Sequence, residues 1–244
     1  MGGWRCSRLM KKGLILLLIL LVPIGVLGAD VTLDTGWSLL VTLSEGSLKA
    51  TSSSASSHTH ACIRATEGKS SGKWYWEITA NAVNIPYVTF DPGICRNDLT
   101  TATDWYTHNS ALVGGYLPDG QPDGGFWGFS INDNTPDAYA DDDVIGIAMD
   151  VDAGKLWFSK NGVWLDSAAG TGNPETGANP SLTFVPGAWS WYAGWGTKYI
   201  GEITFNFGGS AFTGTKPSGF TSYDSADAIS DNLSSVGYSG VGIN

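Results

Sequence analysis

The stretch from Asp143 to Val163, DVIGIAMDVDAGKLWFSKNGV, decides the fold of this 244-residue chain. An apolar run at 144–151 is followed by an Asp-Ala-Gly turn at 152–154 and by a second run, KLWFSK, at 155–160. Asn161-Gly162 then predicts a tight hairpin, because both residues tolerate a positive φ. The stretch therefore predicts two antiparallel strands joined by a short turn, with a third strand starting at Val163.

Strand-like spacing continues on both sides of this stretch. KWYWEITA at 73–80 alternates most clearly: Trp74, Trp76 and Ile78 share one face. Tyr75 and Glu77 share the opposite face. No window of the chain after the leader has the apolar spacing of a long helix. A series of short strands separated by turn residues predicts an all-β fold, a two-sheet antiparallel β-sandwich. The other predicted strands are 37–43, 47–51, 62–66, 86–96, 111–116, 125–131, 163–165, 182–185, 189–195 and 202–207.

The charge balance excludes one class of partner. The chain has 13 Lys and Arg residues against 23 Asp and Glu residues, which gives a formal net charge of −10. Nucleic-acid binding depends on clustered Lys and Arg, so a protein this acidic is not expected to bind nucleic acid. High Gly and Trp counts, 33 and 11, with only 15% charged residues, agree with strands and tight turns rather than helices.

The first 29 residues have the pattern of a signal peptide. Lys11 and Lys12 precede an apolar run from Gly13 to Gly28, and small residues near its end fit a cleavage site after Gly28 or Ala29. The alternative is an uncleaved membrane anchor with the domain outside. Either way the sequence predicts a secreted or extracytoplasmic protein. We expect a domain at 30–222 and a Ser/Gly/Asp-rich tail at 223–244.

Three segments, in order, resemble the SPRY domain family. CIRAT at 62–66 and SGKWYWEI at 71–78 are similar to its opening signature, and Asp143–Val163 resembles its central hairpin. EITFNFG at 202–208, followed by Phe212 and by PSGF at 217–220, resembles its closing strand and Pro-x-Gly-Phe end. GICR at 93–96 also resembles a strand in the middle of the family domain. The resemblance covers residues 37–222, and three motifs in register make it more specific than any one of them.

The resemblance implies a bent sandwich of the concanavalin-like, SPRY type without a catalytic centre. Members of this family bind peptide segments or protein surfaces through loops at one end. Trp195-Gly196 is similar to a Trp-Gly pair in the peptide-binding members, where a Tyr from the middle of the domain joins it. Tyr106 is the nearest candidate for that Tyr. We therefore predict a half-exposed Trp195 as the anchor of a ligand site, with a packed Trp at the sandwich edge as the competing interpretation. The remaining predicted site residues, expected to orient the ligand by hydrogen bonds, are Asp104, Thr107 and Thr197.

No catalytic or metal-binding pattern stands out, so we expect neither an enzyme nor a cofactor. The histidines at 58, 60 and 108 lack an accompanying nucleophile or third ligand, and the glutamates are scattered rather than closely spaced on one strand. The Asp-rich turns at 141–143 and 150–154 leave calcium binding as an alternative, because calcium prefers several oxygen ligands. Asp and Gly are, however, also the usual residues of turns. Cys62 and Cys95 are either disulfide-bonded or separately buried.

These observations predict a non-enzymatic recognition module that binds a protein or peptide. The alternative is a carbohydrate-binding or adhesive module, in which exposed Trp and Tyr rings stack on sugars. Contact with a membrane is expected only if the leader stays uncleaved.

Overall fold

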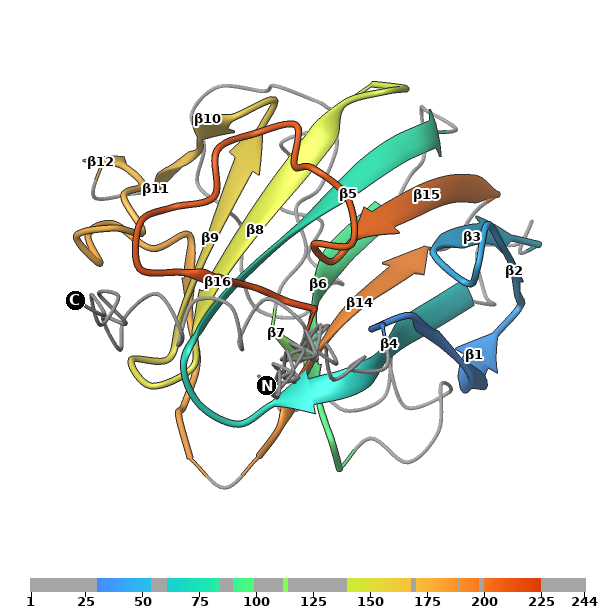
Figure 1. Cartoon of the computed structure of the whole chain (residues 1–244), viewed down its shortest axis with the longest axis horizontal. Coiled ribbons are helices and arrows are strands. Elements are labelled where there is room, and N and C mark those ends of the chain that lie inside the picture. The colour runs from blue at the N-terminus through green and yellow to red at the C-terminus, as the bar shows by residue number, and fades with distance from the viewer. Residues whose placement is uncertain are drawn as a thin grey trace, which may run out of the picture.

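The computed structural model describes residues 30–53, 61–83, 90–98, 112–113, 140–167, 170–187, 189–197 and 200–224, and these form two facing antiparallel sheets without a helix (Figure 1). The predicted all-β sandwich is thus confirmed. No helix able by its length and apolarity to cross a membrane occurs in these residues. The predicted strand at 125–131 lies outside them.

The smaller sheet has five strands in the order β1-β4-β14-β6-β7. Its middle strand, β14, pairs with β4 on one side and β6 on the other, so both of its backbone edges are covered. The bounds of these strands are β1 Leu33–Leu39, β4 Ala61–Lys69, β14 Trp191–Thr197, β6 Phe90–Arg96 and β7 Leu112–Val113.

The larger sheet has the strand order β10-β9-β8-β5-β15-β3-β2, with β13 also paired to β9 and β16 to β5. A separate pair, β11 and β12, lies beside it. The bounds are β2 Val41–Ser44, β3 Lys49–Ser52, β5 Lys73–Val83, β8 Val144–Asp150, β9 Lys155–Lys160, β10 Val163–Trp164, β11 Asp166–Ser167, β12 Gly170–Thr171, β13 Leu182–Thr183, β15 Gly201–Asn206 and β16 Thr221–Ser222.

The predicted hairpin forms as the sequence indicates. β8 pairs with β9 in antiparallel register, Ile147 opposite Phe158, and β9 continues into β10 through a two-residue turn. Asn161 and Gly162 have φ values of 50° and 82°. A turn of this type requires positive φ at both positions, and Asn and Gly adopt positive φ more readily than other residues. Asn161 also accepts a 2.8 Å hydrogen bond from the Val144 backbone N–H through Oδ1, so its side chain ties the turn to β8.

The predicted strand at 37–43 is instead two strands in different sheets. Leu40 has a φ of 54°, which breaks the extended backbone, so β1 joins the five-stranded sheet and β2 joins the nine-stranded sheet. The apolar alternation of 37–43 is the same on either side of this corner, which is why the sequence alone predicts one continuous strand.

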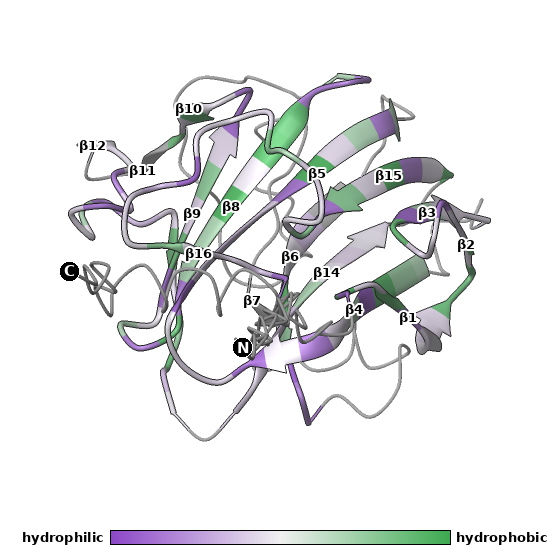
Figure 2. Ribbon diagram, in the orientation of Figure 1, coloured by the Kyte–Doolittle hydropathy of each residue, from purple (hydrophilic) through white to green (hydrophobic). Residues whose placement is uncertain are grey.

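The main core lies between the sheets and follows the predicted alternation of β5. Trp76 and Ile78 face inward and are fully buried among apolar side chains of both sheets. β8, most of whose residues are apolar in Figure 2, contributes Ile145, Ile147 and Met149 to the same core. Period-two alternation thus places alternate residues of each strand against the opposite sheet.

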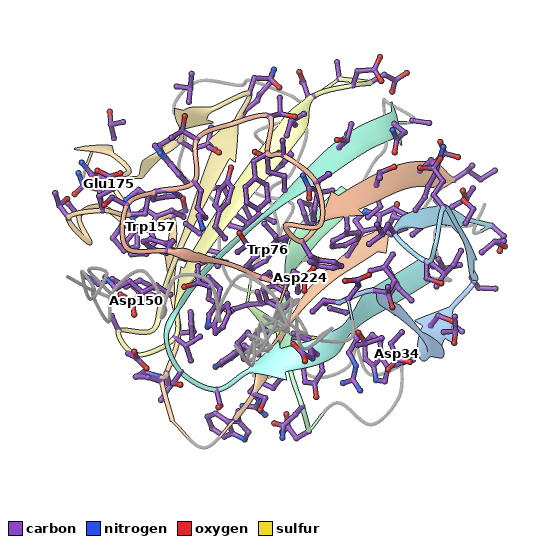
Figure 3. All side chains as sticks on the ribbon, viewed as in Figure 1. Asp34, Trp76, Asp150, Trp157, Glu175 and Asp224 are labelled. Carbon is purple, nitrogen blue, oxygen red and sulfur yellow. The ribbon has the colours of Figure 1, made fainter. Side chains whose placement is uncertain are left out.

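A second apolar layer covers the outer face of the nine-stranded sheet. Residues 208–220, here called the C-terminal strap, leave β15 and cross in front of this sheet (Figure 1). Phe212 and Phe220 of the strap pack on Tyr75 and Trp157. Trp157 and Glu175 lie beside the strap in Figure 3, and Glu175 accepts a 2.8 Å hydrogen bond from the Ser218 backbone N–H.

Glu77 holds the C-terminal strap to the sheet. Its carboxylate is only 2% exposed and accepts 2.7 Å hydrogen bonds from the backbone N–H groups of Thr213 and Gly214. The Tyr75 hydroxyl donates a third, at 2.8 Å. Burial, followed by the neighbouring Glu77 carboxylate, raises the pKa of Tyr75, so this hydroxyl stays a donor. A buried carboxylate is tolerated here because several donors surround it.

The domain extends past the predicted boundary at residue 222. Tyr223 is fully buried in the main core and Asp224 is 5% exposed. The Tyr223 backbone N–H donates to the Tyr75 carbonyl, and that of Asp224 donates to the Phe207 carbonyl. The first two residues of the predicted tail therefore belong to the folded domain, because Tyr223 completes the core.

Candidate recognition surface

The structure places Trp195 in the core rather than at a surface. Its side chain is 0% exposed and points, with Trp191 and Ala193, from β14 toward the opposite sheet. The prediction of a half-exposed Trp195 is therefore wrong. Trp195 is packed, as in the competing interpretation, but on the central strand of the sheet rather than at the sandwich edge. The alternation of β14 carries the signal: Trp191, Ala193 and Trp195 have the same parity, as residues on one face of a strand do.

The residues after Trp195 are also covered. Gly196 lies between Cys62 and Asp91 of the neighbouring strands, and Thr197 lies between Ala61 and Phe90. Both Gly196 and Thr197 are buried, so the Thr197 hydroxyl does not face solvent as the predicted ligand contact requires. The other predicted site residues, Asp104, Tyr106 and Thr107, lie outside the described residues, and their role stays a prediction.

An arginine is stacked between aromatic rings on the outer face of the five-stranded sheet. The Arg64 guanidinium lies 4.7 Å from the ring centroid of Trp37 and 4.3 Å from that of Tyr192. Tyr192 lies so close to Gly68 that a Cβ there would come within 2.5 Å of its ring. Cation–π stacking of this kind stabilises the face between β1 and β14. The Arg64 guanidinium also covers ring surface of Trp37 and Tyr192 on which a ligand would otherwise stack.

No disulfide joins Cys62 and Cys95, which settles the pairing that the sequence leaves open. Cys62 belongs to β4 and Cys95 to β6, and β14 runs between them. Neighbouring strands lie about 4.8 Å apart, so these two strands are about 10 Å apart, beyond the Cα separation of ~7 Å that a disulfide allows. Burial raises the pKa of Cys95 to about 12 and also raises the pKa of Cys62.

One carboxylate in each Asp-rich turn, that of Asp143 and that of Asp150, is bonded within the fold. Asp150 accepts a hydrogen bond from the Ala153 backbone N–H at 2.8 Å and pairs with Lys73 at 3.2 Å. Asp143 contacts the Ala140 backbone N–H, Asn161 Nδ2 and the Lys160 ammonium. Within the described part of the chain, no three His, Cys, Asp or Glu residues are grouped so that they could hold a metal ion.

One end of the sandwich combines strand ends with exposed apolar side chains. β14 ends at Thr197 and β15 begins at Gly201, so the chain passes from one sheet to the other at this end. Gly201 lies opposite Val83 at the end of β5. At the same end, β3, the neighbour of β15, ends at Ser52, and β2 begins at Val41, which lies opposite Ser52. In Figure 1, β15, β3 and β2 lie side by side along one side of the molecule.

Leu40, Ser53 and Ile200, here called the apolar rim, lie one residue beyond these strand ends. The Leu40 carbonyl accepts hydrogen bonds from Ser53, from N–H at 2.9 Å and from Oγ at 3.1 Å. Leu40 is 38% exposed and Ile200 is 52% exposed. The two other large apolar side chains exposed in the described residues, Val163 and Val185, lie apart from the rim. The rim is not evident from the sequence, because Leu40 lies within an apolar run that predicts one continuous strand at 37–43 without a corner.

Comparison with known proteins supports the fold but not a family. No family model matches the sequence, and no curated protein matches it. The structure is similar to the SPRY domain of human HERC1, with a TM-score of 0.52 and 14% sequence identity. The match covers 73% of this chain and 99% of that domain. At this identity the likeness shows that the chain has a SPRY-like fold.

The SPRY-like sandwich leaves no tryptophan of the described residues exposed. Five of these tryptophans, including Trp76 and Trp157, are buried, and Trp74, Trp164 and Trp189 are half-buried. Trp189 is further covered by Arg96, whose guanidinium lies 4.2 Å from its ring centroid. An open aromatic platform for sugar stacking is thus absent from the described residues.

Proposed function

We propose that this chain is a non-enzymatic recognition module that binds a protein or peptide segment at the apolar rim. The observation that carries the proposal is the exposure of Leu40 and Ile200 at the end where several strand connections meet. Leu40 is paired with Ser53, and Ile200 comes two residues before Glu202, which lies opposite Thr51, so continuing this register places Ile200 on the other side of Ser53. Loops held by a rigid sandwich are a common place for binding residues, and clustered exposed apolar side chains are a common sign of an interface.

The fold and the charge of the chain support the same proposal. A SPRY-like fold is used for protein interaction in the family that the sequence resembles. The net charge of −10 favours a neutral or basic partner over an acidic one. We also propose that the domain works outside the cytoplasm, as the leader sequence predicts.

The test compares two serine variants of similarly exposed apolar residues. A library of linear twelve-residue peptides displayed on phage is selected against the purified chain, and the binders are synthesised for affinity measurement. Ile200→Ser should weaken binding by about tenfold or more, because it removes apolar contact area at the rim. Val185→Ser is the matched control: Val185 is 70% exposed and lies at the opposite end, beside Gly154.

Two results would contradict the proposed function. The first is equal affinity of the selected peptides for Ile200→Ser and for the unchanged chain. The second is a loss of affinity in Val185→Ser as large as in Ile200→Ser, which would indicate a nonspecific apolar effect. Melting curves of both variants show whether each retains the fold, and little change is expected at such exposed positions.

A further inference from the structure

β2 is the edge strand of the nine-stranded sheet. It pairs with β3 through Val41 to Ser44 and is the last strand in that order. In Figure 1, β2 lies at the side of the molecule. It begins directly after Leu40, where the backbone turns. An edge strand has a row of backbone N–H and C=O groups that can pair with another extended chain.

The pairing pattern shows which backbone groups of β2 face outward. Ser53 N–H donates to the Leu40 carbonyl, so Leu40 and Ser53 form a hydrogen-bonded pair of the antiparallel ladder. These pairs alternate with non-hydrogen-bonded ones, so Thr42 and Ser44 also point their backbone groups at β3. Val41 and Leu43 therefore direct their N–H and C=O groups away from the sheet. No described residue is hydrogen-bonded to these outward groups.

The sequence of β2 lacks the residues that commonly block an edge strand, although the strand is only four residues long. Natural edge strands are commonly blocked by Lys, by Pro or by a bulge. Val41 to Ser44 reads VTLS, with neither a charge nor a proline, and its register with β3 is regular. Val41 and Leu43 are half-buried and pack against the main core, so the strand is held firmly while its outer edge stays polar and uncharged.

The backbone at both ends of β2 is in an uncommon conformation. Leu40 and Glu45 have φ values of 54° and 52°, and neither is a glycine. Such conformations cost free energy and persist where the surrounding structure holds them, often at functional sites. Here they turn the chain at both ends, so that a short straight edge is presented between two corners, and the Leu40 corner belongs to the apolar rim.

We propose that an extended peptide segment with a basic side chain binds along β2 as an additional strand. This inference rests on the proposed function, since it states in which conformation the peptide that binds at the apolar rim is held. A strand supplies the alternating donors and acceptors that Val41 and Leu43 require. Glu45 and Glu202 share the single ammonium of Lys49, at 3.4 Å and 2.7 Å, so the region beside β2 has an excess negative charge.

A second copy of the chain is a poorer partner for the same edge. Two chains that each carry a net charge of −10 repel each other as they approach. A basic segment is attracted by the same charge. The proposed partner is therefore a different protein.

The test uses a matched pair of variants at Leu43 with the peptides selected above. Leu43→Pro removes the outward N–H without breaking a bond to β3, and Thr42 before it is already extended, as a residue before proline must be. Leu43→Ala loses the same side chain but keeps the N–H. Peptide affinity should be about tenfold lower for Leu43→Pro than for Leu43→Ala.

Chemical modification of the peptide gives a second measurement that does not depend on a folded variant. Each backbone amide of a selected peptide is N-methylated in turn, and affinity for the unchanged chain is measured. Strand addition predicts that every second amide is sensitive, because alternate amides face the edge. Replacing the basic residues of the peptide by alanine should weaken binding, and this effect should shrink at high salt.

The outcomes separate this inference from the proposed function. If Ile200→Ser weakens binding while the Leu43 variants bind equally and N-methylation has no two-residue period, the rim binds a peptide but strand addition is wrong. If neither Ile200→Ser nor Leu43→Pro alters affinity, both are wrong. Dimerisation of the chain through β2, detected as a concentration-dependent mass that Leu43→Pro abolishes, would also overturn the inference, because the edge would then be occupied by a second copy.

Discussion

Trp195 lies on the central strand of the five-stranded sheet, and its indole is part of the core that joins the two sheets. Trp195→Ala should therefore lower the free energy of unfolding by about 3–5 kcal/mol, since it leaves a large cavity. Urea denaturation followed by circular dichroism measures this. Trp189→Ala, at a half-buried position, is the control and should cost less. An unchanged midpoint for Trp195→Ala would contradict its placement in the core.

The Tyr223 hydroxyl lies where the pairing between β14 and β4 of the five-stranded sheet is interrupted. The pairing of β14 with β4 is irregular between Tyr192 and Gly194, and the intervening Ala193 N–H donates to the Tyr223 hydroxyl at 3.0 Å. This hydroxyl donates to the Glu67 carbonyl at 2.7 Å. Burial raises the pKa of Tyr223, so the hydroxyl remains protonated.

Tyr223→Phe should destabilise the domain by about 1–3 kcal/mol, because the Ala193 N–H loses its partner in a buried place. Equilibrium unfolding in urea measures the loss. Tyr192→Phe is the matched control, since it keeps the ring stacked on Arg64. Equal stability of the two variants would show that the Tyr223 hydroxyl contributes nothing.

The lowered pKa of Asp143 predicts that the stability of the domain depends on pH. Burial would raise the pKa of Asp143, but hydrogen bonds from the Ala140 N–H and from Asn161 and the nearby Lys160 ammonium outweigh it and lower the pKa below its ordinary value of 3.8. A lowered pKa in the folded state contributes stability above the unfolded pKa, and this is lost as the pH falls.

The unchanged chain should thus exceed Asp143→Asn in stability at neutral pH, and the difference should shrink as the pH falls below about 4. Melting temperatures of both proteins between pH 7 and pH 3 test this. A difference that stays constant over that range would exclude a contribution from the Asp143 charge.

At the scale of elements, the hairpin between β9 and β10 depends on the conformation of its two turn residues. Gly162 has a φ of 82°, and a Cβ placed there would meet nothing closer than Gly214 Cα at 4.0 Å. The cost of substitution is therefore conformational rather than steric. Gly162→Val should destabilise the domain by about 1–3 kcal/mol, because a β-branched residue resists a positive φ.

Gly162→Asn is the matched control for this turn, since Asn adopts a positive φ more readily than other side chains. Thermal melting of the two variants compares them directly. If Val and Asn at 162 give the same melting temperature, the turn does not constrain the backbone in the way that its φ values indicate.

At the scale of the whole molecule, the leader predicts export. A basic segment, an apolar run and small residues near its end should direct cleavage, so that the mature protein begins near Ala29 or Asp30. Mass spectrometry of protein collected outside the producing cells measures its N-terminus. Recovery of secreted protein that still starts at Met1 would contradict cleavage.

The sequence by itself determined the all-β class, the Asn161-Gly162 hairpin and the inward face of β5, because each depends on the alternation or turn chemistry of adjacent residues. Only the tertiary structure decided that the outward residues Tyr75 and Glu77 are also buried, since the C-terminal strap that covers them is more than 130 residues away in sequence. The same holds for Trp195, whose exposure depends on which sheet faces β14, and for Leu40, where one strand becomes two. Alternation records that successive side chains point to opposite faces, but contacts between distant segments decide which of those faces is covered.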